Sequence, residues 1–158
     1  MSVVQNQEDG VSLFGEDIVQ LCGFKIGGQH FAIPVLEVQE VIKSEQVTRL
    51  PLAPVHIKGL INLRGQIVTL VSLRSLFGLD EKEDEDSMHI IVRSGDSLFS
   101  LMVDGISDVL DISLKSYEET PSTLKDDIKK YISGVYKLED DLIVQLDLDK
   151  LLDRKENK

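Results

Sequence analysis

Short runs of alternating apolar and polar residues fill most of the chain, and turn-forming residues separate them. Runs of this length with a period of two predict β-strands rather than helices. Glycine and aspartate at Gly27-Gly28, Gly65, Gly95-Asp96 and Asp140-Asp141 favour tight turns between the runs. We therefore predict strands at 18–26, 30–34, 38–43, 47–50, 57–63, 66–72, 89–94, 97–103, 107–111, 131–138 and 141–146.

Helical patterns are few and short. Residues 73–77 have apolar positions three or four apart and stop at Gly78, a common helix C-terminal residue. Residues 148–152 repeat this pattern after Asp147, a good N-cap. A further helix is expected within 123–130. Many short strands with few helices indicate an all-β fold of barrels or sandwiches.

The strand pattern occurs twice along the chain. With a shift of 75 residues, the run from Ile57 to Leu76 falls on the run from Ile132 to Leu151 with its apolar positions and one glycine matched. With a shift of 68, the run from Phe31 to Ile42 falls on the run from Phe99 to Leu110. Chance matching of apolar strands is the alternative. The pattern favours two β-rich units, the second with seven extra residues within 117–127.

Several separated motifs resemble one known family. They lie in the segments 31–33, 38–42, 47–51, 57–65, 103–110 and 146–152, and together they closely resemble the CheW-like domain of bacterial chemotaxis coupling proteins over about residues 18–152. The resemblance implies two five-stranded, SH3-like β-barrel lobes packed together, and the sequence leaves open whether strands exchange between them. It also implies an adaptor that links the cytoplasmic tip of a methyl-accepting chemoreceptor to the regulatory domain of the CheA histidine kinase.

The charge balance excludes several classes of partner. The 158 residues carry 28 acidic and 17 basic side chains, a formal charge of −11, which repels nucleic-acid backbones and anionic lipid surfaces. No apolar run reaches the roughly 20 residues of a membrane span. The single Cys22 cannot form an intramolecular disulfide, and we expect it to be a buried thiol. We expect a cytoplasmic protein, peripheral to membrane receptor arrays, without nucleic-acid binding or direct membrane insertion.

The expected domain organisation is simple. Residues 1–16 form a mobile N-terminal tail, residues 17–153 form a single domain of two duplicated lobes, and residues 154–158 form a C-terminal tail. The acidic run 80–86 is interpreted as a linker between the two units, and it matches no role in the family.

Residues suited to catalysis do not converge. His30, His56 and His89 are far apart in the sequence and have no partners at metal-ligand spacing. Gly27-Gly28 lacks the lysine and hydroxyl residue of a phosphate-binding loop. We therefore expect no catalytic site, no metal, no cofactor and no enzymatic activity.

One charged pair distinguishes the first unit from the second. Glu40 corresponds to Asp108, whereas Arg64 corresponds to Glu139, so only the first unit can form a salt bridge. Asn62 likewise corresponds to Lys137, which indicates that folding does not dictate the polar tip. We hypothesise a surface pair of Glu40 and Arg64, and the resemblance implies that these positions lie where chemoreceptors bind. Two independent solvated side chains are the alternative.

Apolar positions near this pair complete the predicted receptor-binding surface. Val38, Val41 and Ile61 should border Glu40, Arg64 and Asn62 if the strands pair in sequence order, although core packing would also explain the valines. Gly59 recurs as Gly134, so we expect a tight backbone approach there rather than binding.

Two other functions remain open at this stage. An adaptor of a related kinase pathway, such as twitching motility, would have the same architecture. A small-molecule sensor could use a groove between two barrel lobes. The sequence does not indicate which face contacts the kinase.

Overall fold

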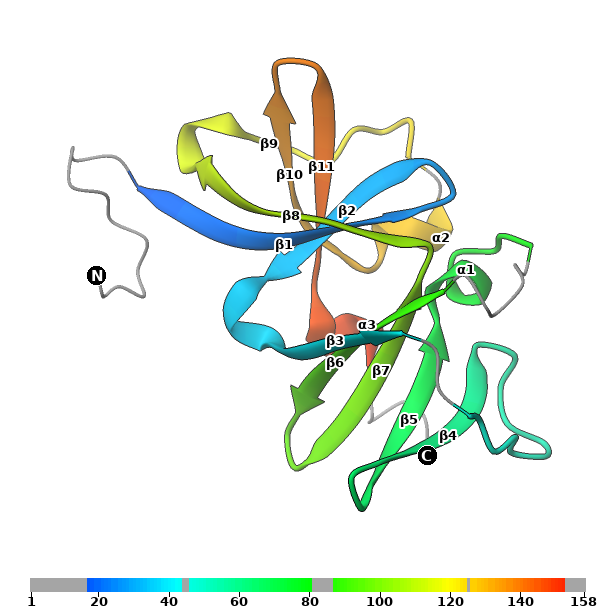
Figure 1. Cartoon of the computed structure of the whole chain (residues 1–158). Coiled ribbons are helices and arrows are strands. Elements are labelled where there is room, and N and C mark those ends of the chain that lie inside the picture. The colour runs from blue at the N-terminus through cyan, green and yellow to red at the C-terminus, as the bar shows by residue number, and fades with distance from the viewer. Residues whose placement is uncertain (1–16, 44–45, 81–86, 125, 153–158) are drawn as a thin grey trace.

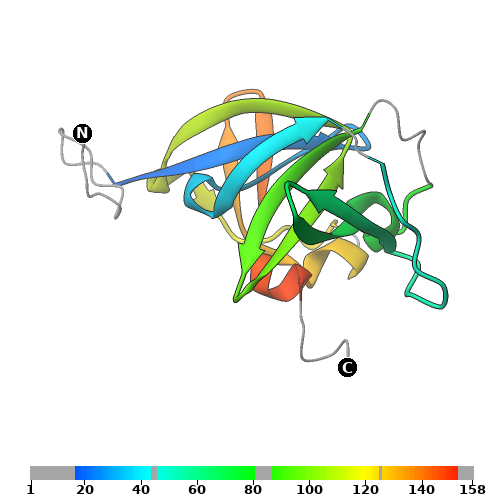
Figure 2. The ribbon, with the colours of Figure 1, turned by 60° about the horizontal axis from the view of Figure 1, so that its bottom comes forward.

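The protein folds into two β-lobes joined at a shared core, shown in Figures 1 and 2. The computed structural model describes residues 17–43, 46–80, 87–124 and 126–152. The predicted tails 1–16 and 154–158, and the acidic run apart from Asp80, lie outside the described residues. The strands are β1 (Ile18–Ile26), β2 (Gln29–Pro34), β3 (Val38–Lys43), β4 (Ile57–Leu63), β5 (Gln66–Ser72), β6 (Met88–Ser94), β7 (Ser97–Val103), β8 (Gly105–Ser113), β9 (Tyr117–Glu118), β10 (Ile132–Leu138) and β11 (Asp141–Leu146).

Short helical segments connect or follow these strands. The α-helices are α1 (Leu73–Leu76), α2 (Asp126–Lys129) and α3 (Leu148–Leu151), and the 3₁₀ turns are η1 (Val35–Glu37) and η3 (Leu114–Ser116). The Ser72 hydroxyl caps α1 and the Asp147 carboxylate caps α3, each accepting a hydrogen bond from a backbone N–H three residues later. Figure 2 shows β1 and β8 crossing one side of the molecule and α2 and α3 on the other.

Each lobe is built around one curved sheet. The first lobe holds a five-stranded sheet in the order β3-β6-β7-β5-β4, and the second holds a six-stranded sheet in the order β8-β1-β2-β11-β10-β9. In Figure 1 the six-stranded sheet is the upper one. The structure confirms the predicted all-β class with two lobes and short helices.

The two sequence units exchange hairpins. The β1–β2 hairpin comes from the first unit, yet it pairs with β8 and β11 in the second lobe. The β6–β7 hairpin comes from the second unit, and it pairs with β3 and β5 in the first lobe. The chain therefore crosses between lobes twice, after β2 and after β7, and each lobe needs strands from both units.

Equivalent strands of the two units pair in equivalent registers. The parallel pair of Thr69 and Phe99 in the first lobe corresponds to Val144 and Phe31 in the second under the shifts of 75 and 68. The β4–β5 ladder has an irregularity between Ile57 and Gly59, and the β10–β11 ladder has one at the equivalent place. Chance matching of apolar strands does not reproduce such registers.

The largest hydrophobic cluster lies at the junction and contains residues from both sheets. Phe24 and Ile33 of the β1–β2 hairpin contact the same cluster as Leu101 of β7 and Val144 of β11. Each lobe also has a smaller cluster, around Ile61 in the first and around Ile143 and its neighbours in the second. Burial of the junction cluster therefore adds to strand pairing in holding the exchanged hairpins in place.

One predicted strand is absent from the structure, and one observed strand was not predicted. Residues 47–50 were expected to be a strand, but Thr48 makes only an isolated bridge to Leu60, because Gly59 lets one short stretch of backbone approach β4. The short β9, which pairs with β10, was not predicted because two residues give no period. Among the described residues, no helix is long and apolar enough to cross a membrane.

Candidate functional site

The Arg64 guanidinium lies against the Glu40 carboxylate at the surface of the first lobe. Its Nη2 donates to Oε1 of Glu40 at 2.7 Å and to Oε2 at 2.8 Å. Glu40 lies on β3 and Arg64 follows β4, and these are the two edge strands of the five-stranded sheet. The predicted salt bridge is therefore present, and it connects the two edges of the curved sheet.

The β4–β5 turn presents Arg64 in an uncommon backbone conformation. Arg64 and Gly65 are the two loop residues between Leu63 and Gln66, and their φ angles are 52° and 89°. Positive φ at both central residues is the signature of a type I′ hairpin turn, which matches the twist of the flanking strands. The side-chain oxygen of Asn62 accepts a hydrogen bond from the Gly65 N–H at 2.9 Å.

This hydrogen bond corrects one expectation. Asn62 was interpreted as part of a polar tip that folding does not dictate, but its side chain stabilises the turn that carries Arg64. Lys137 at the equivalent position cannot accept such a bond, and neither Glu139 nor Asp140 has a positive φ. Asn62 is exposed, so it remains accessible to a partner as well.

Both members of the pair are accessible. The side chain of Arg64 is 70% exposed and that of Glu40 is 31% exposed, and Arg64 has no second hydrogen-bond partner among the described residues. A surface pair of this kind contributes at most about 1 kcal/mol to stability. Folding alone therefore gives little reason for the arrangement.

The second lobe has no equivalent pair. Asp108 on β8 and Glu139 after β10 occupy the matching positions, and both are exposed. Two carboxylates repel each other, so Asp108 and Glu139 cannot form a salt bridge like that of the first lobe. The two lobes therefore share a backbone plan and differ in the chemistry of one surface.

The predicted apolar residues fall into two groups. Val41 is 37% exposed on β3, whereas Val38 is half-buried and packs on the junction cluster. Ile61 is only 1% exposed and belongs to the core of the first lobe. Ile61 was expected to border the surface; instead it points inward, because β4 alternates buried and exposed positions there. It is therefore not available to a partner.

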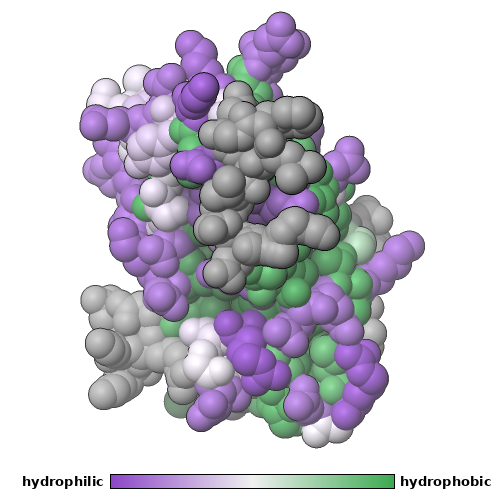
Figure 3. All heavy atoms as spheres, turned by 90° about the vertical axis from the view of Figure 1, so that its left-hand side faces the viewer, coloured by the Kyte–Doolittle hydropathy of each residue, from purple (hydrophilic) through white to green (hydrophobic). Residues whose placement is uncertain are grey.

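Apolar residues reach the surface at several places, some of them on the face shown in Figure 3, and the sequence reasoning missed most of them, including the following three. Ile106 and Val109 on β8 are 36% and 57% exposed, and the shift of 68 places them at the positions of Val38 and Val41. Ile67, 60% exposed, lies opposite Asn62 in the β4–β5 ladder. The repeat alignment could have identified the first two, since both β3 and β8 are edge strands.

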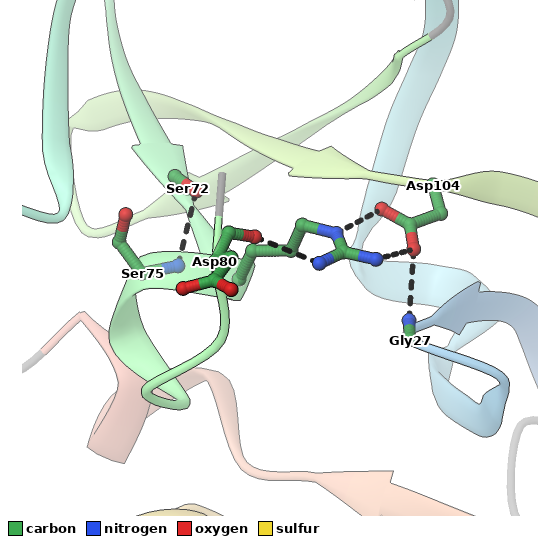
Figure 4. Close-up of polar contacts among 6 residues, drawn as sticks. Gly27, Ser72, Ser75, Asp80 and Asp104 are labelled. Carbon is green, nitrogen blue, oxygen red and sulfur yellow. Dashed lines mark hydrogen bonds and ion pairs between the residues drawn. The ribbon is translucent and has the colours of Figure 1, made fainter. Parts of the chain in front are cut away.

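A second, less exposed ion pair links the lobes at the crossover after β7 (Figure 4). Arg74 of α1 donates from Nε to Oδ1 of Asp104 at 2.9 Å and from Nη2 to Oδ2 at 3.0 Å. Oδ2 of Asp104 also accepts a hydrogen bond from the Gly27 N–H at 2.8 Å. Arg74 Nη1 donates to the carbonyl oxygen of Asp80 at 2.7 Å.

These contacts form a clamp between the two lobes. The side chains of Arg74 and Asp104 are 19% and 16% exposed, and the bidentate geometry fixes their orientation. Arg74 follows the first-lobe sheet, while Gly27 lies in the exchanged β1–β2 hairpin. Sequence reasoning missed this pair, although Asp104 lies within one of the family motifs.

Other titratable groups have pKa values that are shifted by burial or by hydrogen bonds within the fold. His30 Nδ1 lies 2.8 Å from Oδ2 of Asp141, and this hydrogen bond is the main cause that lowers the pKa of Asp141. Burial raises the pKa of the Cys22 thiol and lowers that of His56. Cys22 is a free, buried cysteine, as expected, and a raised pKa makes it a poor nucleophile.

No metal-binding group is found in the part of the chain that the structure describes. There, no three residues of the types His, Cys, Asp and Glu are arranged to hold an ion. The described surface therefore offers an accessible charge pair and exposed apolar strand positions, which are features suited to binding another protein.

Comparison with known proteins gives consistent matches over most of the chain. The family model described as the CheW-like domain matches residues 20–156. A chemotaxis protein CheW of Helicobacter pylori is 33% identical over 152 residues, which cover 96% of this chain and 88% of that protein. A chemotaxis protein CheW of Klebsiella aerogenes is 33% identical over 134 residues, covering 84% and 81%.

A solved structure has the same fold. The crystal structure of the scaffolding protein TtCheW from Thermoanaerobacter tengcongensis aligns with a TM-score of 0.73 and 28% sequence identity. The alignment covers 81% of this chain and 88% of that one. The exchanged double-lobe architecture and the sequence motifs therefore point to the same family.

Proposed function

The chain belongs to the CheW-like domain family, and from that premise we propose that it is a chemotaxis adaptor that couples chemoreceptors to the CheA histidine kinase. Its activity is binding, and no chemical step is assigned to it. The family assignment supports the class of function. The exposed pair of Arg64 and Glu40 is the observation that carries the proposed receptor site.

The proposed receptor surface is centred on this pair. It comprises Glu40, Arg64 and Asn62, and Ile67, opposite Asn62, extends it along the β4–β5 hairpin. Val41 directly follows Glu40 on the edge strand β3, so its exposed side chain points to the other face of the sheet and borders this surface only at the strand edge, with the half-buried Val38 nearby. A charged pair that is accessible in the free protein can be desolvated on binding, and truncating one member then costs about 2–5 kcal/mol of affinity. The same truncation has little effect on folding, because the pair is exposed.

The two lobes suit an adaptor because their surfaces differ. The first lobe presents the bridged edges with a positive and a negative side chain, and the second presents Asp108 and Glu139 at the matching places. We propose that the first lobe contacts the receptor tip and that a separate apolar surface contacts the regulatory domain of the kinase. The protein would then act at the membrane-associated receptor arrays without entering the membrane.

Signal transfer would follow from differential contacts. A receptor change can shift the active and inactive populations of the kinase only if the adaptor binds the two states with different affinity. The Arg74–Asp104 clamp holds the two lobes in one orientation. We propose that this rigidity lets a change of contact on one lobe alter the position of a partner on the other.

Co-sedimentation of the purified protein with receptor and kinase fragments tests the proposal. With the receptor concentration varied, Arg64→Glu should raise the dissociation constant for receptor by at least about tenfold, as expected for a loss of about 1.4 kcal/mol or more. Arg93→Glu is the matched control, because Arg93 is an exposed arginine on β6 of the same lobe. Unchanged sedimentation of the Arg64→Glu variant would contradict the receptor site.

The same experiment separates the related pathways. Fragments of a chemotaxis kinase and of a kinase for twitching motility can be offered in parallel with the same receptor. Preferential binding of the chemotaxis kinase supports the proposal, and preferential binding of the other assigns the adaptor to that pathway.

A further inference from the structure

A mostly apolar pocket lies at the junction of the two lobes, and its lining includes neither Arg64 nor Glu40. Its cavity volume is about 220 Å³. Its walls come from four separate segments: the β1–β2 hairpin, the end of α1 with the following turn, β11, and, last, the region before and within α2. The last of these overlaps the segment in which the second unit carries extra residues. The first unit has no equivalent of these extra residues, so the repeat provides no second copy of this wall.

The lining is mostly apolar, with Gln29 and Thr123 as its polar side chains, and it carries no charge. Phe31, Phe77 and Val144 form buried walls, and Leu124 and Ile128 are half-buried beside them. None of the lining residues is Asp, Glu, Lys, Arg or His. Because an unpaired charge is costly to bury, such a pocket selects against charged molecules.

The aromatic residues around the pocket point to the class of ligand. The ring centroids of Phe31 and Phe77 are 5.3 Å apart with an angle of 32° between planes, and the series continues to Phe24 on one side and Tyr131 on the other. Aromatic rings prefer offset or tilted neighbours at such distances. A ring inside the pocket would extend the same series of contacts.

The volume limits the size of that molecule. A protein cavity of about 150 Å³ lined by Leu, Ile and Phe binds benzene. A cavity of 220 Å³ therefore suits a ring system somewhat larger than benzene, on the order of ten non-hydrogen atoms.

One polar group could orient the ligand. The Gln29 amide nitrogen donates to the backbone carbonyls of His30 and Leu142 at 3.4 Å and 3.2 Å, which fixes the side chain at the pocket wall. Its carbonyl oxygen makes no hydrogen bond to another described residue, so it can accept one from a ring N–H.

A docked protein chain fits this place less well. A stable protein interface buries more than about 1,000 Å² in total and needs accessible apolar surface around the pocket. The large apolar side chains that are most exposed, Leu36, Leu52 and Val55, do not line it. The pocket is thus an isolated apolar hollow rather than the centre of an apolar surface.

We propose that this pocket binds a small, uncharged aromatic molecule of about the size of indole. The inference does not depend on the adaptor function. An occupant would contact segments from both sequence units, including Gly27, whose N–H is held by Asp104 of the interlobe clamp. Binding would therefore stabilise the junction between the lobes.

Amide chemical-shift titration of the full chain with indole tests the proposal, with indole-3-carboxylate as a charged match. Indole should give saturable shifts at the amides of Gly27, Leu124 and Ile128, and the carboxylate should give much weaker ones. Leu124→Trp fills the pocket and should raise the half-saturation concentration at least about tenfold. Ser122→Trp is the control, because Ser122 is exposed and does not line the pocket.

If Leu124→Trp does not fold, Ile128→Phe is a second variant that fills the pocket, and it should likewise raise the half-saturation concentration for indole. Shifts without saturation, shifts that are equally large at Leu52 and Val55, or equal responses of the wild-type and filled proteins would overturn the proposal. Saturation of the same amides by a tryptophan-containing peptide but not by indole would also overturn it, in favour of a side chain supplied by a partner. These readouts involve neither receptor nor kinase, so the adaptor function is tested separately.

Discussion

Gly59 and Gly134 occupy equivalent positions in the two units, and each makes room for a different neighbour. Gly59 has a φ of 145°, and a Cβ there would lie 2.3 Å from the carbonyl oxygen of Thr48. At Gly134, a Cβ would lie 2.6 Å from Cε1 of the Tyr117 ring. Both positions require a close approach, as the repeat predicted, but backbone approaches one glycine and an aromatic side chain the other.

Gly59→Ala should destabilise the protein strongly. The Thr48 backbone cannot move away without breaking its two hydrogen bonds to Leu60, and the backbone conformation is itself unfavourable for alanine. We expect the free energy of unfolding in denaturant to fall by about 3 kcal/mol or more. Gly105→Ala is the control, because a Cβ at Gly105 meets nothing within 4 Å; equal losses in the two variants would contradict this explanation.

Arg64→Asn separates binding from folding at the proposed receptor site. Asn-Gly is a preferred sequence for a turn with two positive φ angles, so the turn should be kept. We expect the thermal midpoint to be equal to or slightly above that of the wild type, while receptor binding falls as for Arg64→Glu. A thermal midpoint several degrees lower would show that Arg64 is needed for the fold.

At the scale of elements, the two crossovers between the lobes differ in charge. Arg74 of α1 corresponds to Asp149 of α3 under the shift of 75. The crossover after β7 therefore has the Arg74–Asp104 clamp, whereas at the crossover after β2 the carboxylate of Glu37 faces Asp147 and Asp149. One crossover is held by attraction, and the other contains like charges.

Asp104→Asn should weaken the clamped crossover. The substitution removes the Asp104 charge from a bidentate pair with a mostly buried guanidinium, and we expect a loss of about 3 kcal/mol in the free energy of unfolding. Chemical denaturation measures this loss. Asp126→Asn is the comparison, because the Asp126 carboxylate lies 3.9 Å from Lys129 and is 99% exposed; an equal loss there would contradict a special role for the clamp.

Glu37→Gln should act in the opposite direction and depend on pH. Burial first, and then Asp149 and Asp147, raise the pKa of Glu37 above its usual value. The folded state therefore binds the proton more tightly than the unfolded state, and stability is lost as pH rises through the folded pKa. We expect the variant to be more stable than the wild type at pH 7, by a margin that shrinks toward pH 4.

Denaturation midpoints of the wild type and of Glu37→Gln, measured between pH 4 and pH 7, test this expectation. Asp141→Asn should instead be less stable than the wild type at pH 7, by a margin that shrinks as the pH falls. The reason is that the hydrogen bond with His30 lowers the pKa of Asp141. Its contribution to stability is present above the unfolded pKa and is lost as pH falls through the folded pKa. A margin for Glu37→Gln that stays constant with pH would exclude this account of Glu37.

Most strands could be predicted because local patterns determine them, whereas the contacts between units could not. Strands such as Ile57–Leu63 and Gln66–Ser72 follow from alternation and a glycine turn. The Glu40–Arg64 pair was found by comparing the repeats. The Arg74–Asp104 clamp and the inward direction of Ile61 depend on which strands pair across the lobes, and a repeat alone does not decide whether hairpins exchange.

At the scale of the whole molecule, hairpin exchange makes the lobes interdependent. Without β6 and β7, the first lobe would lose the strands between β3 and β5; without β1 and β2, the second would lose those between β8 and β11. The junction cluster also takes residues from both units. Neither sequence unit therefore has a complete core of its own.

Separate expression of residues 1–80 and 81–158 tests this interdependence. Each fragment alone should lack a cooperative thermal transition, because its sheets are interrupted and its junction cluster is exposed. Mixing the two should restore the transition and the circular dichroism of the intact chain. Cooperative unfolding of either isolated fragment would show that the units fold independently.

The central claim is that one bridged pair on the first lobe, absent from the second, forms the receptor-docking surface of this adaptor. Co-sedimentation of the Arg64→Asn variant with a chemoreceptor fragment tests it most directly, since that substitution removes the charge and keeps the turn. The account predicts a binding loss of about tenfold or more with an unchanged thermal midpoint. Wild-type binding by this variant would contradict it.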